Sequence, residues 1–126
     1  IYQHVLVKAP DYDKANIGLA ELAGEEGDYQ QALKLMDDLL KQQPENTEIF
    51  FHHALLLEKA GKLDEAIRQL QQLLKTKPNH VRSWRKLGLW LEQKGDLKEA
   101  RLAMLETLKL DPNDKLIRQK IQTIPQ

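Results

Sequence analysis

The hydrophobic positions of this chain follow the spacing of amphipathic helices, and these helices come in pairs. Between Pro44 and Gly61 the apolar residues recur at i, i+4 and i+7, and a second helical stripe runs from Leu63 to Leu74. Gly61 supplies the left-handed residue that closes a helix, and Pro78 stops the second helix because it lacks a backbone donor. The segment therefore predicts two antiparallel helices joined by a tight turn.

The same helix pair repeats every 34 residues. Three residue types keep this step: Pro10, Pro44, Pro78 and Pro112; Gly27, Gly61 and Gly95; and Ala32, Ala66 and Ala100. We expect each alanine to let two helices approach closely, and Gly88 to do the same from the partner helix. One pair cannot bury its own apolar face, so about three stacked units are needed for a stable core.

This register divides the chain into three complete units with partial units on both sides. The predicted boundaries are 1–12 for the tail of a truncated preceding repeat, 13–46, 47–80 and 81–114 for the three units, and 115–126 for a C-terminal capping helix. The chain also starts at Ile rather than Met, which predicts a preceding segment.

These residues resemble the signature of the tetratricopeptide repeat. The third unit carries it as Trp84, Leu87, Gly88, Leu91, Gly95, Leu97, Ala100, Met104 and Pro112. The middle unit matches with Phe50, Ala54, Leu57, Gly61, Leu63, Ala66, Leu70 and Pro78, but has His53 where the third unit has Leu87. The resemblance implies an all-α, right-handed superhelical solenoid of antiparallel helix pairs. It also implies a concave groove, lined by the first helix of each unit, that binds a peptide or protein.

The groove face of the first helices is the predicted partner-binding surface. In the second unit, Phe51 and Leu55 remain apolar after the core stripes of their helix are assigned. A helix that is hydrophobic nearly all round is expected to be buried on all sides, so a partner helix or extended peptide would cover them. A basic wall would stand beside this apolar centre. The predicted partner-binding residues are Ile17, Glu21, Phe51, His52, Leu55, Glu58, Arg82, Arg85, Lys86 and Leu89.

Three other interpretations compete with this one. The simplest is that Phe51 and Leu55 are ordinary exposed apolar residues. The second is a self-associating assembly module, a homo-oligomer formed through the apolar N-terminal end that the truncated repeat leaves open. The third is the carboxylate clamp of chaperone-binding relatives, whose basic part Arg82 and Lys86 match. However, Ile17 and Glu21 stand where that clamp has Lys and Asn, His52 replaces an Asn, and Glu21 would repel a carboxylate.

Composition narrows the chemistry. The absence of cysteine excludes disulfides, thiolate zinc sites and thiol nucleophiles. Lys and Arg number 19 and Asp and Glu number 19, so a formal charge of zero gives no general attraction to nucleic acid or anionic membrane. No apolar stretch approaches the ~18 residues of a membrane span. The composition predicts a soluble domain and leaves its compartment open between cytoplasm and periplasm.

Candidate catalytic and metal-binding residues lack the required spacing. His52 and His53 point about 100° apart on one helix and cannot share a metal, and His53 lies on the core stripe as a satisfied core histidine. Ser83, the single serine, lies mid-helix without the turn of an activated nucleophile. Trp84 lies on the core stripe, which disfavours stacking on bases. We therefore predict a non-enzymatic chain with no catalytic residue, no metal, no cofactor and no nucleic-acid partner.

Overall fold

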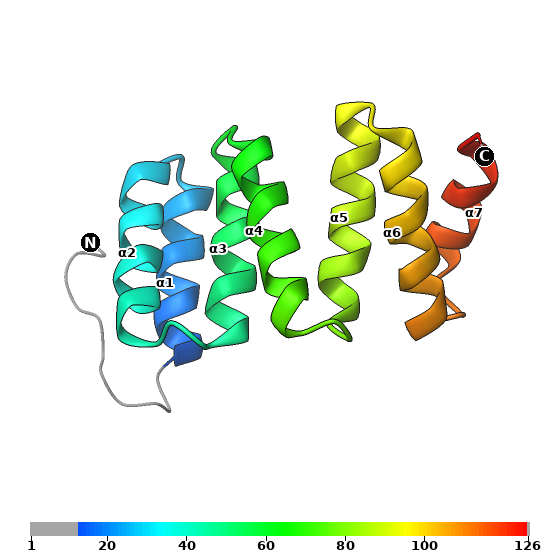
Figure 1. Ribbon diagram of the computed structural model, residues 1–126. Helices are drawn as coiled ribbons and strands as arrows, with labels where there is room; N and C mark the ends of the chain where they lie inside the picture. The colour runs from blue at the N-terminus through cyan, green and yellow to red at the C-terminus, as the bar shows by residue number, and fades with distance from the viewer. Residues whose placement is uncertain (1–12, 126) are drawn as a thin grey trace. The chain divides into compact units, whose positions relative to one another are not determined.

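Every regular element in the described part of the chain is a helix. The computed structural model describes residues 13–125, with side chains from Ile17 onward (Figure 1). The helices in this range are α1 Asp13–Glu25, α2 Tyr29–Gln42, α3 Thr47–Lys59, α4 Leu63–Thr76, α5 Val81–Lys94, α6 Leu97–Leu110 and α7 Lys115–Thr123. The predicted all-α fold is confirmed. The predicted N-terminal repeat tail, residues 1–12, lies outside the described residues.

The turns inside the helix pairs depend on glycine. Gly27, Gly61 and Gly95 have φ angles of 88°, 85° and 94°, the left-handed region that a Cβ atom disfavours. At Gly95 the backbone N–H donates to the carbonyl of Glu92, and the following residue donates to Leu91 O at 2.9 Å. The predicted role of these glycines in closing the first helices is confirmed.

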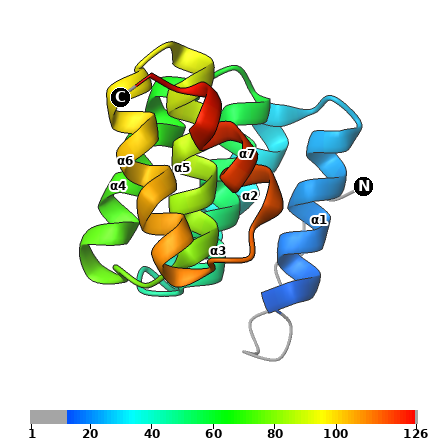
Figure 2. The ribbon, with the colours of Figure 1, turned by 90° about the vertical axis from the view of Figure 1, so that its right-hand side faces the viewer.

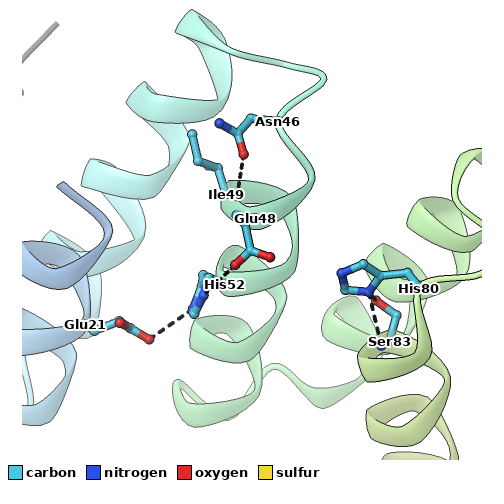
Figure 3. Close-up of polar contacts among 7 residues, drawn as sticks. All are labelled: Glu21, Asn46, Glu48, Ile49, His52, His80 and Ser83. Carbon is cyan, nitrogen blue, oxygen red and sulfur yellow. Dashed lines mark hydrogen bonds and ion pairs between the residues drawn. The ribbon is translucent and has the colours of Figure 1, made fainter. Parts of the chain in front are cut away.

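Side chains cap the helices that open each pair. Asn46 accepts from the backbone N–H of Ile49 at 3.2 Å, and His80 Nδ1 accepts from that of Ser83 at 3.3 Å (Figure 3). Asp114 accepts from the backbone N–H of Ile117 at 3.2 Å. The three caps lie 34 residues apart, so α7 begins at the same register as α3 and α5.

The chain forms two compact units, Ile1–Gln69 and Leu70–Gln126, with the division inside α4. In the first unit, α2 packs against α1 and α3, and α1 also contacts α3. The core of this unit consists of small and aliphatic side chains: Ile17, Ala20, Ala23, Ala32, Leu35, Met36, Leu39, Ile49 and Leu56. The alanines in this set are fully buried, as expected for residues that let helices approach closely.

In the second unit, α6 packs against both α5 and α7. Its buried side chains include Leu87, Trp90, Leu91, Ala100, Ala103, Met104, Ile117 and Ile124. A Cβ atom placed on Gly88 of α5 would lie 2.9 Å from Met104 Cγ and 3.4 Å from the Met104 backbone nitrogen of α6. The predicted close approach at Gly88 is confirmed.

Alanine substitution at two helical glycines tests this packing. Gly88→Ala should lower the free energy of unfolding by about 1 kcal/mol, because overpacking against Met104 outweighs the gain in helix propensity. Gly18→Ala, where no atom lies within 4 Å of the added Cβ, should raise it by roughly 0.5–1 kcal/mol. Thermal unfolding followed by circular dichroism compares them. Equal stabilisation by both substitutions would contradict close packing at Gly88.

Candidate functional site

The predicted partner-binding residues lie on first helices of both units. In the first unit, α1 carries Ile17 and Glu21, and α3 carries Phe51, His52, Leu55 and Glu58. In the second unit, α5 carries Arg82, Arg85, Lys86 and Leu89.

The expected exposure of Phe51 is wrong, and so is that of Ile17. Phe51 is 4% exposed and Ile17 is 5% exposed. The physical reason is that α3 contacts α1 as well as α2, so its own unit covers more of its circumference than the two core stripes counted from the sequence. Neither side chain forms an open contact surface. Leu55, one turn beyond Phe51, stays half-buried.

A polar cluster joins α1 to α3 beside Leu55. His52 Nδ1 lies 3.0 Å from Glu21 Oε2, and His52 Nε2 lies 3.5 Å from Glu48 Oε2 (Figure 3). The Phe51 ring meets the imidazole edge-on, with 5.8 Å between the ring centroids. Glu21 and His52 therefore contact each other, and a partner at either residue must compete with that contact. The carboxylates here give the surface of the first unit an acidic character.

His53 is the satisfied core histidine that the sequence predicts. It is 8% exposed, and its Nε2 lies 2.7 Å from Asp37 Oδ1 while its Nδ1 lies 2.7 Å from Gln69 Nε2. The Gln69 amide also donates to the Phe50 carbonyl at 3.0 Å. Because the amide nitrogen only donates, Nδ1 is the acceptor and Nε2–H donates to Asp37. The contacts link α2, α3 and α4 within the first unit, and helical periodicity alone identifies neither partner.

In the second unit the predicted basic wall is smaller than expected. Arg85 Nε donates to Asp114 Oδ2 at 2.7 Å, and the Asp114 side chain is only 9% exposed. Arg85 is thus part of an internal contact with α7, which corrects its assignment to the wall. Arg82 is exposed, and Lys86 and Leu89 are half-buried. Arg82 and Lys86 remain as the cationic residues next to Leu89.

Polar contacts hold α7 against α5 and α6, as Figures 1 and 2 show. Besides the Arg85–Asp114 pair, Lys120 Nζ lies 2.9 Å from Glu92 Oε1, and Arg101 Nη1 donates to the Ile121 carbonyl at 3.2 Å. These bonds surround Ile117, which is fully buried. The helix at the C-terminal end is therefore an integral part of the second unit.

A hollow of about 760 Å³ lies in the second unit, away from the predicted surface. Trp84, predicted to lie in the core, is half-buried on its wall, and its indole Nε1 donates to the Pro78 carbonyl at 2.7 Å. The sequence analysis missed this feature. A comparison of Leu102 and Leu105 with the same positions in the other units would have indicated it.

The described residues contain no metal-like cluster of three or more His, Asp or Glu side chains. Within the same range, each helix is too short or too polar to cross a lipid bilayer. Ser83 is buried, and its hydroxyl lies 2.7 Å from His80 Nδ1 in the cap of α5.

Asp114 combines a helix cap with an ion pair, and two substitutions separate these roles. Asp114→Ala should lower the free energy that opens α7 by about 1–2 kcal/mol, because the cap of Ile117 and the bond from Arg85 are both lost. Asp114→Asn keeps the cap acceptor and should cost less. Amide hydrogen exchange of α7 measures both. Unchanged exchange in the alanine variant would show that these bonds do not hold the helix.

Comparison with known proteins places this arrangement among characterised folds. A family model described as tetratricopeptide repeat matches residues 1–50, 23–88 and 57–122. Comparison with curated protein sequences gave no match.

Several solved structures are similar. The type III secretion translocator chaperone SycD of Yersinia enterocolitica has a TM-score of 0.80 and 20% identity, covering 92% of both chains. SycD in complex with a peptide of the translocator YopD has a TM-score of 0.73 and 20% identity, covering 91% of this chain and 88% of that one. The first repeat domain of Spaghetti (RPAP3), bound to the HSP90 peptide SRMEEVD, has a TM-score of 0.76 and 14% identity, covering 87% and 89%. At these identities the likeness concerns the fold.

Proposed function

Because this chain belongs to the tetratricopeptide-repeat family, we propose that it is a non-catalytic interaction module that binds a polypeptide through the exposed face of its first helices. The family resemblance predicts that these faces line a concave groove. The similar structures bound to the HSP90 peptide and to the YopD peptide support a polypeptide ligand as the class of partner.

The observation that carries this proposal is a pair of partly exposed leucines at one register position. Leu55 in α3 and Leu89 in α5 are 34 residues apart, and both are half-buried. Leucine is not needed at this position for a unit to fold, because the first unit has Glu21 there. Apolar side chains at equivalent surface points of two repeats are suited to contact with apolar residues of a partner.

The charges near the two leucines differ between the units. Lys86 and Arg82 lie beside Leu89, whereas Glu58 and the Glu21–His52 pair lie beside Leu55. Charged rims of this kind select partners and orient them more than they add affinity. We therefore propose a partner segment with apolar residues and an acidic stretch, and we place the acidic stretch against α5.

An array of peptides with apolar centres and either acidic or basic flanks tests this proposal. The full chain should retain acidic-flanked peptides, and Leu89→Glu should weaken that binding about tenfold or more. Lys86→Glu should shift the preference towards basic flanks, because it reverses the charge beside Leu89. Leu97→Glu, which changes a leucine of α6 that is 39% exposed, is the matched control. Binding that is equal in all these variants would refute the proposed surface.

A second test concerns the carboxylate clamp. Glu21 occupies a clamp position and its carboxylate contacts His52, so a peptide C-terminus meets like charge there. We expect the peptide SRMEEVD and its C-terminal amide to bind this chain with affinities within about twofold of each other. Isothermal titration calorimetry compares the two peptides. A loss of binding on amidation would restore the clamp as the mode of recognition, and Glu21→Asn would then be expected to tighten it.

A further inference from the structure

The third repeat carries two surface leucines where the other repeats have polar residues. Leu102 and Leu105 of α6 are 58% and 40% exposed. In the same register, Leu102 corresponds to Lys34 and Arg68, and Leu105 corresponds to Asp37 and Gln71. The next turn of this helix face keeps its polar character in all three units, as Lys41, Lys75 and Lys109. The change to leucine is thus specific to one stretch of α6.

These leucines border the hollow of about 760 Å³ in the second unit. Its lining is Gln71, Trp84, Leu87, Leu91, Glu99, Leu102, Ala103, Leu105, Glu106 and Lys109. A single exposed leucine needs no explanation, but neighbouring apolar side chains that share one concave wall are typical of a binding site. The volume lies within the roughly 300–1,000 Å³ range of ligand sites.

Part of the hollow is fixed in place before any partner arrives. The indole of Trp84 is held by its hydrogen bond to the Pro78 carbonyl at 2.7 Å. Leu87 and Leu91 are 4% and 3% exposed and belong to the core between α5 and α6. A partner therefore meets a rigid wall on α5 and a leucine-lined wall on α6, which lowers the entropic cost of binding.

The rim of the hollow carries an excess negative charge. Glu106 Oε1 lies 3.4 Å from Lys109 Nζ, so these two charges offset each other. Glu99 is exposed and makes no ion pair within residues 13–125. A partner that places Lys or Arg near Glu99 gains an attraction that an acidic partner lacks.

We propose that this hollow is a second docking site, which binds an amphipathic helix of another protein. Leu102 and Leu105 lie one turn apart, and the lining of α6 extends from Glu99 to Lys109, about 15 Å along the helix axis. Apolar residues of a partner helix at i and i+3 or i+4 fit such a wall. A Lys or Arg on the same partner helix faces Glu99. This site is separate from the first-helix face and binds a partner of opposite charge.

Two matched peptides of about 15 residues test the docking site with the full chain. Both have leucines at i, i+3 and i+7, and one has lysines at its flanks while the other has glutamates. The lysine-flanked peptide should bind and change the tryptophan emission in a saturable way. Because Trp84 lies on the wall, Trp84→Phe should remove that change, although Trp90 remains.

Substitutions taken from the other repeats keep the test independent of folding. Leu102→Arg and Leu105→Gln install the residues that the second unit has at these positions, so both variants should fold. Each should weaken the lysine-flanked peptide about tenfold. Glu99→Lys should reverse the preference in favour of the glutamate-flanked peptide. Leu97→Glu, whose 39% exposure matches the 40% of Leu105, should have no effect.

The outcomes separate this site from the proposed function. Leu89→Glu should leave the lysine-flanked peptide bound, so the two surfaces fail or succeed independently. The docking site is refuted if neither peptide binds, if Leu102→Arg leaves binding unchanged, or if Glu99→Lys leaves the preference unchanged. Light scattering provides one more test: a dimer of the full chain that Leu105→Gln dissociates would assign the hollow to a second copy and overturn the proposal.

Discussion

The close approach of helices at small side chains is the constraint on which each unit depends. In the second unit, Gly88 leaves no space for a Cβ atom against Met104, and Ala100 is completely buried beside it. In the first unit, Ala32 has the same register position as Ala100 and the same full burial. Larger residues at these points would separate the helices, expose the aliphatic core and remove the packing energy that holds each pair.

This packing also decides which residues remain for partners. Once small residues bring the helices together, the positions that face neither the pair nor its neighbour repeat along the chain. Leu55 and Leu89 occupy one such position on the first helices, and Leu102 occupies another on the second helix of the third unit. Their apolar character is not required by the fold, because the corresponding residues of other units, Glu21 and Arg68, are charged. A requirement for binding explains these leucines better than a requirement for stability.

The sequence was sufficient for the fold but only partly sufficient for the site. Left-handed glycines and prolines have a conformational cause, so their 34-residue step located the helices and turns directly. The burial of Phe51 depends on contacts of α3 with two other helices, and a single-helix periodicity does not count them. The bond from Arg85 to Asp114 spans 29 residues and needs the packed position of α7. The hollow was also missed, because helical periodicity was compared within units rather than position by position between them.

The central claim is that a polypeptide partner binds the exposed face of the first helices. Chemical-shift mapping of the isotopically labelled full chain, titrated with an acidic-flanked apolar peptide, tests it most directly. We predict that the largest shifts occur at the amides around Leu55 in α3 and Leu89 in α5, with little change around Leu97 in α6. Shifts confined to α6, or spread evenly over the described helices, would contradict the account.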